Sequence, residues 1–498
     1  SFSPLYQVAL SLTGGDGTAQ KAVVGGLEIE PMPIELVAAR LDLTMMLVDH
    51  GDIVDGMLEF TTDLFDPDTI DLFLIHFTRA LESVCDDRGL SLDAFQLYSQ
   101  QELSQQLTDG RQVDAVLPLS PMQRDFCLDS LRHPDSNRNT IGYAVRIPQI
   151  DMGRWRDALG MVAQANPFLR SRVVVADLRG ADSLYQLIIQ DCNVHIELHD
   201  WSQDQLTSDQ LADAVNLLAL PSWQIEDRPL CQYDVVKVTD TDYYFVVSAH
   251  HSVFDGISKV KHFQQVVAAY EGSSIDTISP VELADWLRTR TAATDRAASL
   301  DFWSDELSSY DAPAPKLHEP GPVVVQNWRI DDANLHQLRA WCSSNGVSVA
   351  NYIRTLYTYA LQRCFYHSDE FVLVDAASGR NENSESLIGC AFQFVPHVQH
   401  GSVVKLDTIY NALQANRAWK KSVGDAQYIS MLQRNALLTP DALEFQFNYR
   451  LDEVKQAIKL AGKEVVIEPL QPDNAGTVKL LVTPDEAGLT LRLSYREN

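Results

Sequence analysis

The 498-residue sequence predicts a mixed α+β protein, and three observations support this fold class. Short apolar runs rich in β-branched and aromatic residues are typical of strands. Apolar residues at helical spacing indicate amphipathic helices between many of these runs. The two patterns mix along the chain without the regular strand–helix alternation of a parallel α/β sheet. Since one hydrophobic core rarely serves so long a chain, we expect roughly two to four folding units.

The composition is that of a globular protein with a strongly acidic balance. Hydrophobic residues make up 45% and charged residues 21% of the chain, and the formal net charge is −29. Such an excess of negative charge argues against general binding to nucleic acids or anionic membranes. The seven cysteines are scattered, and no apolar run is long enough to span a membrane. We therefore expect a cytoplasmic protein with reduced cysteines and with neither nucleic-acid nor membrane partners.

The first part of the chain is expected to contain a few strands and one clear helix. Strands are predicted over residues 5–12, 41–48 and 57–61. The helix then begins with Asp66 as its N-cap and Pro67 at its first position. One face of this helix carries an apolar stripe formed by Ile70, Phe73, Phe77, Leu81 and Val84.

A longer mixed region follows a polar, glutamine-rich stretch. Its first helix has Ser120 as N-cap and Pro121 at the first helical position. Further helices are predicted over residues 155–165, 331–342, 348–364 and 406–419. Strands are predicted over residues 170–175, 184–190, 194–198, 235–238, 243–250, 370–377, 392–398, 443–449 and 480–495. The Pro-rich stretch 312–322 indicates a boundary between two halves of this region.

An internal similarity indicates that the chain contains parts of two related units. Residues 3–10 resemble residues 441–448, and residues 41–60 resemble residues 479–495. The chain thus holds the tail of one unit and then most of a second copy. We assign the tail and the start of a linker to residues 1–105, the linker to 106–115, and the two lobes of the second copy to 116–285 and 286–498.

The candidate site is the turn between a strand-like run that ends near His250 and a helix that begins after Asp255. A neutral imidazole at His251 can accept a proton or hydrogen-bond a nucleophile. Gly256 permits a close turn, and its exposed backbone N–H can help to stabilise an oxyanion. A histidine at a strand end is also commonly structural, so the residues alone leave both interpretations open. No metal site is expected, because His250 and His251 point to opposite faces of a strand and lack a third nearby ligand.

The string His250-His251-Ser-Val-Phe-Asp255-Gly256 resembles the His-His-x-x-x-Asp-Gly motif of nonribosomal peptide synthetase condensation domains. Other stretches resemble further motifs of this family in the same chain order, namely residues 119–123, 166–172, 378–381 and 388–396. The resemblance covers residues 116–495. Residues 1–105 resemble the tail of a preceding condensation domain, which agrees with the internal similarity.

The resemblance implies a fold of two chloramphenicol acetyltransferase-like lobes that form a V around a central tunnel. It also implies amide-bond formation between two substrates, a donor acyl or peptidyl thioester and an aminoacyl acceptor. Both substrates would be carried on the phosphopantetheine arms of donor and acceptor carrier domains of the synthetase, so no bound cofactor is expected. His251 would act on the amine and Gly256 would lie near the oxyanion. His250 would support the turn, and Asp255 would be structural, paired with Arg170.

Several alternatives to amide formation remain within and outside the same class. A terminal condensation-like domain makes a macrocycle or an ester, and an epimerisation domain shares the histidine motif. A stand-alone acyltransferase that uses coenzyme A shares the pattern His-x-x-x-Asp-Gly. A degenerate domain that only docks carriers or other partners belongs to a different class, and loss of the second histidine would favour it.

Overall fold

The computed structural model describes most of the chain, and its fold is mixed α+β, as the sequence predicts. The described residues are 6–14, 22–24, 27–29, 39, 41–86, 98–176, 184–190, 194–226, 228–291, 301, 304–305, 323–364, 371–380, 384–399, 445–450, 458–470, 478–485 and 488–496. The predicted helix 406–419 and the Pro-rich stretch 312–322 lie outside these residues. In the described part, no helix is both long and apolar enough to cross a membrane.

The chain divides into two compact units, Ser1–Leu97 and Tyr98–Asn498. The larger unit starts earlier than the sequence interpretation assumes. Its first helix, α2 (Gln100–Leu107), begins with a capping box in which Ser99 and Glu102 bond each other's backbone N–H groups. Tyr98 and Leu103 are buried, and strand β6 (Val113–Pro118) starts inside the stretch expected as a linker. The boundaries at 105 and 115 are therefore wrong, because this segment already packs into the larger unit.

The first lobe of the larger unit is built on a five-stranded sheet in the order β10-β11-β12-β7-β19. These strands are β10 (Ile196–Asp200), β11 (Cys231–Lys237), β12 (Asp242–His250), β7 (Thr140–Pro148) and β19 (Ile467–Leu470). Phe245 and Val247 of β12 lie in the main core, while Val246 lies in a second cluster on the opposite face. Burial of both faces explains why β12 is a continuous apolar run rather than an alternating one.

Helices cover the two faces of this sheet. The main core includes side chains of α4 (Met152–Ala165) and α6 (Gly256–Glu271), and the second cluster includes α5 (Ser208–Ala219). A smaller sheet in the order β6-β9-β8 completes the lobe, with β9 at Leu184–Ile189, β8 at Ser171–Val175 and the short helix η2 at Pro167–Arg170. Helix α3 (Pro121–Arg132) has the predicted cap at Ser120.

The sequence interpretation misses strand β7 of the first lobe and places a lobe boundary inside a helix. Strand β7 contains Gly142, whose missing side chain weakens the strand pattern. A Cβ at this position would lie 2.5 Å from the carbonyl oxygen of Val247 on the neighbouring strand, so the close approach requires glycine. The expected lobe boundary at 285 falls inside α7 (Pro280–Thr291). It is wrong because Trp286 and Leu287 of this helix belong to the core of the first lobe.

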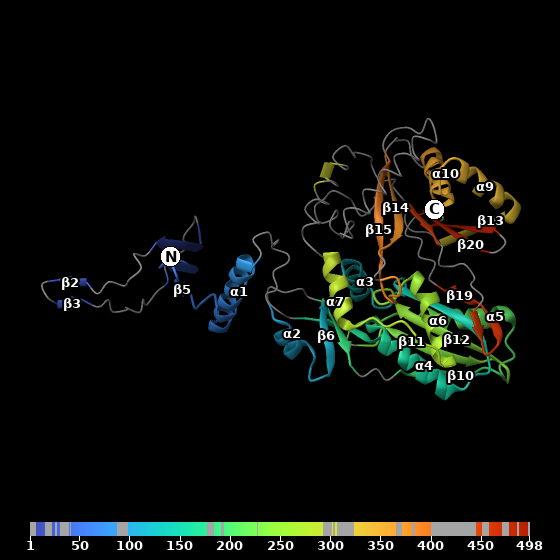
Figure 1. The fold of residues 1–498 in the computed structure, drawn as a ribbon, viewed down its shortest axis with the longest axis horizontal. Coiled ribbons are helices and arrows are strands. Elements are labelled where there is room, and N and C mark those ends of the chain that lie inside the picture. The colour runs from blue at the N-terminus through green and yellow to red at the C-terminus, as the bar shows by residue number, and fades with distance from the viewer. Residues whose placement is uncertain are drawn as a thin grey trace. The chain divides into compact units, whose positions relative to one another are not determined.

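The second lobe contains a six-stranded sheet in the order β13-β21-β20-β16-β14-β15. Its strands are β13 (Val323–Asp331), β21 (Gly488–Arg496), β20 (Val478–Asp485), β16 (Phe445–Tyr449), β14 (Phe371–Ser378) and β15 (Phe392–Gln399). Helices α9 (Asp332–Ser344) and α10 (Val349–Cys364) lie together beside this sheet (Figure 1). Leu335, Ile353 and Tyr357 of these helices share a core with β16, β20 and β21.

Strand β19 joins the two lobes of the larger unit. It lies between strands of the second lobe in sequence, after the hairpin β17 (Ile458–Leu460) and β18 (Lys463–Val465). It nevertheless pairs antiparallel with β7, with Ile467 opposite Val145 and Leu470 opposite Gly142. The second half of the chain thus adds an edge strand to the sheet that carries β12.

The unit Ser1–Leu97 repeats part of the second lobe's topology. Its strands β1 (Val8–Gly14), β4 (Leu43–Asp49) and β5 (Val54–Phe60) form a sheet in which β1 is parallel and β5 antiparallel to β4. Strands β16, β20 and β21 have the same order and directions. In both places a short hairpin also lies between the two parallel strands along the chain. In the smaller unit it is formed by β2 (Ala22–Val24) and β3 (Leu27–Ile29), and in the second lobe by β17 and β18.

Helix α1 (Pro67–Asp86) follows β5 and starts at Pro67, as predicted. Its apolar stripe is only partly covered. Ile70 is 5% exposed, whereas Phe73, Leu81 and Val84 are 39%, 51% and 42% exposed. In β1, Val8, Leu10 and Leu12 are each more than 60% exposed. The described part of this unit therefore leaves a large share of its apolar surface in contact with solvent.

Candidate active site

The His-His segment forms the connection between β12 and α6. Strand β12 ends at His250, and α6 begins at Gly256 with Asp255 as its N-cap. Backbone hydrogen bonds fix the turn on both sides. The N–H of His250 donates to Leu230 O at 2.9 Å, and the N–H of His251 donates to Asn139 O at 2.8 Å. The two imidazoles therefore start from a backbone that neighbouring segments hold in place.

His250 is a buried structural residue. The backbone N–H of Ser252 donates to Nδ1 at 3.3 Å, so Nδ1 is an acceptor and Nε2 carries the proton. Nε2 then donates to Ser130 Oγ at 2.9 Å. Burial, followed by the neighbouring His251, lowers the pKa of His250 to about 3. The ring is thus neutral at physiological pH, and both of its nitrogens are used to hold the turn.

His251 lies between aromatic side chains of the two lobes. Its ring stacks on Phe126 of α3, with ring centroids 4.7 Å apart and planes 9° apart. Phe392 of β15 packs on it with a centroid distance of 4.9 Å. Nδ1 is buried and has no hydrogen bond to another described residue. The imidazole is therefore oriented by packing rather than by a hydrogen bond at Nδ1.

The environment of His251 keeps its imidazole neutral. Burial is the main cause, and together with the positive charges of Lys259 and Arg450 it lowers the pKa of His251 to about 4. The carboxylate of Asp255 and the backbone of His251 itself act in the opposite direction but do not compensate. An imidazole with this pKa accepts hydrogen bonds at neutral pH and is a weak base.

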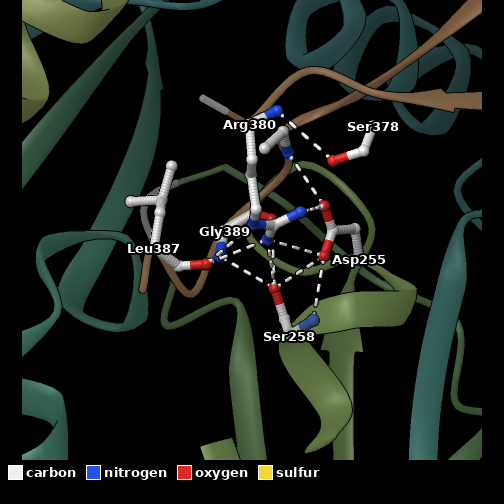
Figure 2. A network of polar contacts seen from close by, with 7 residues as sticks. Asp255, Ser258, Ser378, Arg380, Leu387 and Gly389 are labelled. Carbon is white, nitrogen blue, oxygen red and sulfur yellow. Dashed lines mark hydrogen bonds and ion pairs between the residues drawn. The ribbon is translucent and has the colours of Figure 1, made fainter. Parts of the chain in front are cut away.

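Asp255 binds Arg380 of the second lobe in a buried bidentate ion pair (Figure 2). The two Asp255–Arg380 nitrogen–oxygen distances are 2.7 and 2.9 Å. The same carboxylate accepts the backbone N–H of Ser258 at 3.0 Å and that of Ala391 at 3.0 Å. Arg380 also donates to the carbonyl oxygens of Leu387 and Gly389. One carboxylate thus caps α6 and binds two points of the second lobe.

The ion pair decides the charge of Asp255. Burial alone raises the pKa of a carboxyl group, but the Arg380 guanidinium and the hydrogen bonds from Ser258 and Ala391 outweigh it. The pKa of Asp255 is consequently lowered, and the group stays ionised at neutral pH. Its negative charge is balanced by Arg380, and both carboxylate oxygens accept hydrogen bonds within the network.

A close packing contact accompanies this network. Ser258 Oγ accepts the N–H of Gly389 at 2.9 Å and so ties α6 to the second lobe. The space beside Gly389 is filled by the ring of Phe168 from η2. A Cβ at Gly389 would lie 2.0 Å from an atom of that ring. Only glycine allows the two lobes to approach this closely here.

The structure corrects the expected partner of Asp255. Arg170 does not bind Asp255. It donates from Nη1 to Asp114 Oδ2 at 2.5 Å and to Ile189 O at 2.6 Å. Arg170 ends η2 and ties it to β6 and β9, while Arg380 occupies the carboxylate of Asp255. The motif 378–381 already contains Arg380, but local sequence gives no sign of a contact across 125 residues.

The remaining site residues have distinct positions. Gly256 is the first residue of α6, where backbone N–H groups lack intrahelical acceptors. The motif 388–396 contributes Gly389, Ala391 and Phe392 to the surroundings of the turn. Phe126 and Ser130 were not predicted as site residues, although both lie on the predicted helix after Ser120. In the described part of the chain, no group of three or more His, Cys, Asp or Glu residues is arranged to hold a metal ion.

Replacing Arg380 by methionine should destabilise the larger unit by about 3–5 kcal/mol, because it leaves the Asp255 carboxylate buried without a counter-charge. Urea unfolding followed by tryptophan fluorescence measures this, since all eight tryptophans lie after residue 98. The difference in free energy of unfolding between this variant and the wild type should become smaller at lower pH, because protonation neutralises the Asp255 carboxylate.

Arg146→Met is the matched control, because Arg146 forms an exposed ion pair with Asp242. Loss of this ion pair should lower the free energy of unfolding by less than about 1 kcal/mol. Equal effects of the two substitutions would contradict the role given to the Asp255–Arg380 pair.

Comparisons with known proteins identify the family of the larger unit. The family model described as the condensation domain matches residues 113–497. A linear gramicidin synthase of Brevibacillus parabrevis is 25% identical over 223 residues, which are 43% of this chain and 4% of that protein. Nonribosomal peptide synthetase gloA of Glarea lozoyensis is 26% identical over 295 residues, which are 57% of this chain and 4% of that protein. The matched region is thus a small part of these relatives.

Solved structures share the fold. The condensation domain of the monacolin K polyketide synthase MokA has a TM-score of 0.65 at 16% identity, over 78% of this chain and 93% of that chain. The starter condensation domain of rhizomide synthetase RzmA has a TM-score of 0.63 at 18% identity, over 77% of this chain and 91% of that chain. Since the family model covers most of the sequence, this chain belongs to the condensation-domain family.

Proposed function

We propose that the larger unit catalyses amide-bond formation between a carrier-tethered acyl or peptidyl thioester and a carrier-tethered aminoacyl group. The observation that carries this proposal is the position of His251. Its neutral ring lies at the boundary of the two lobes, between Phe126 and Phe392. The turn that presents it is bound to the second lobe through Asp255 and Arg380. Loss of these groups would be expected in a domain that only docks partners.

The substrates follow from the multidomain relatives. The relative gloA is named as a nonribosomal peptide synthetase, and both it and the linear gramicidin synthase are far longer than this chain. By analogy, donor and acceptor carrier domains deliver thioesters on phosphopantetheine arms, and neighbouring synthetase domains are further partners. Cys85, Cys127, Cys342 and Cys364 are free thiols, which fits the proposed cytoplasmic location of such an enzyme.

His251 is assigned to positioning the acceptor amine rather than to deprotonating its ammonium form. An α-amino group has a pKa near 8, while that of His251 is about 4. Complete transfer of a proton from ammonium to this imidazole would cost about 5 kcal/mol. Accepting a hydrogen bond from the neutral amine has no such cost. The more acidic ammonium of the tetrahedral intermediate is a better proton donor to the same nitrogen.

The other residues of the turn are assigned supporting roles. The backbone N–H of Gly256, at the positive end of α6, is proposed to stabilise the developing oxyanion. Asp255 and His250 are positioning residues, because their polar atoms are used by Arg380, Ser258, Ser130 and Ser252. The proposed chemistry therefore rests on two groups that face substrate, His251 and Gly256.

The unit Ser1–Leu97 is proposed to be the end of a second lobe from a preceding condensation-like domain. Its sheet β1-β4-β5 repeats the order and directions of β16-β20-β21. In the second lobe, β16 also pairs with β14, whereas β1 pairs only with β4 among the described strands. The open edge and the exposed Val8, Leu10 and Leu12 mark where the preceding lobe would continue.

An open edge at β1 should make its amides exchange at least about tenfold faster than those of β16, because one neighbouring strand is missing. Hydrogen exchange with mass spectrometry on the intact chain measures both segments in one experiment. Comparable protection of β1 and β16 would show that the edge is covered and would contradict this assignment.

His251→Ala should lower the rate of amide formation by at least about 100-fold without unfolding the domain, because it removes the proposed substrate-facing nitrogen. The assay uses two carrier proteins loaded with candidate acyl and aminoacyl groups, and intact mass follows the transfer. His336→Ala is the matched control, since His336 is an exposed residue of α9 and lies outside the turn.

The products in this assay also separate the alternatives. Transfer to the amine of the second carrier supports amide formation. An ester, a released ring or an inverted stereocentre would support a terminal or epimerising domain, and transfer from coenzyme A would support a stand-alone acyltransferase. Wild-type activity of His251→Ala would overturn the site assignment.

A further inference from the structure

A cavity of about 650 Å³ lies in the first lobe, where β8, β9, β10 and β11 come together. This volume is typical of small-molecule binding sites. The described residues that line it do not include His251, Asp255 or Gly256. One short segment separates the two places, because Pro229 and Cys231 line the cavity while Leu230 O accepts the N–H of His250. The proposed amide-forming reaction does not use this cavity.

The wall of the cavity carries positive charge in an acidic protein. The chain has 39 basic residues, counted as Lys and Arg, against 68 acidic ones. Three arginines, Arg170, Arg172 and Arg228, are nevertheless among the described residues that line this one cavity. Glu197 is the single acidic residue among the described lining residues, and it lies 3.1 Å from His195 Nε2. The described lining residues therefore carry more basic than acidic groups, although Arg170 is already paired with Asp114.

Two buried side chains of the wall have unused hydrogen-bond donors. Arg170 is 6% exposed, and its Nη1 is engaged with Asp114 and Ile189. Its Nε has no hydrogen-bond partner among the described residues. The indole Nε1 of Trp223, which is 9% exposed, is likewise without a partner there. Both nitrogens are shielded from solvent in this conformation, so a ligand oxygen can satisfy them only when the Arg170 or Trp223 side chain turns toward the cavity.

We propose that this cavity binds a small organic anion, a carboxylate or a phosphate monoester, between Arg170, Arg172 and Arg228. Guanidinium groups match the geometry of both anions and bind them through charge-assisted hydrogen bonds. Trp223 and Tyr233 supply a flat apolar surface for the part of the ligand that carries the anion. The inference is independent of the reaction proposed for the His251 turn.

Indole N–H resonances of the intact chain test this site. The signal of Trp223 is identified by its loss in Trp223→Phe. We expect it to shift in a saturable way with inorganic phosphate, with glutarate or with both, at constant ionic strength. The comparison of the two anions distinguishes a phosphate site from a carboxylate site. Glutaramide, which has the same length as glutarate without its charge, should cause no saturable shift.

Arg228→Gln should weaken binding of the effective anion by at least about tenfold, because it removes a charge-assisted contact from an exposed position. Arg172→Gln provides a second test, and Arg146→Gln, on an exposed ion pair with Asp242, is the control that should keep wild-type affinity. Urea midpoints confirm that each variant is folded. No saturable shift with either anion, an equal response to glutaramide, or unchanged affinity in both cavity variants would overturn the proposal.

Discussion

The buried ion pair between Asp255 and Arg380 is the contact on which the candidate active site depends. A single carboxylate caps α6, binds the Arg380 guanidinium and accepts the N–H of Ala391. These contacts hold the start of α6 against the second lobe. A buried ion pair often adds little net stability compared with apolar packing, because both charges lose their hydration. Its contribution here is geometric, since no apolar pair would fix three backbone segments at once.

The position and the charge state of His251 both follow from this arrangement. The stretch that brings Ala391 to Asp255 continues directly into Phe392, which packs on the His251 ring. Phe126 closes the other side, and the resulting burial lowers the pKa of the imidazole. Strand β19 adds another link between the two lobes by pairing with β7, the neighbour of β12 in the sheet. The two lobes therefore share the site, and neither forms it alone.

Local sequence signals predicted the elements around the site well. The apolar run that forms β12, the cap at Ser120 and the helix after Asp255 are all set by residues close in sequence. The resemblance to condensation domains located the turn itself. The internal similarity also agrees with the matching topologies of β1-β4-β5 and β16-β20-β21.

Contacts between distant residues account for what the sequence did not reveal. Arg170 was a reasonable partner for Asp255 by charge, but its position at the end of η2 brings it to Asp114 instead. Strand β7 is not predicted because Gly142 interrupts its pattern of side chains. This glycine is required where the backbone comes close to Val247 of the neighbouring strand. The sequence does not indicate that β19 pairs with the sheet of the first lobe. A four-residue edge strand is too short to show a clear hydrophobic periodicity.

The most direct test of this account is the pKa of His251, measured by NMR titration of its ring carbon signals. The signals are assigned by their loss in His251→Ala. Burial between Phe126 and Phe392 predicts a pKa of about 4, so the ring stays neutral as the pH falls from 8 to about 5. A pKa at or above the ordinary value of about 6.5 would show an imidazole that charges readily, and it would contradict the positioning role assigned to His251.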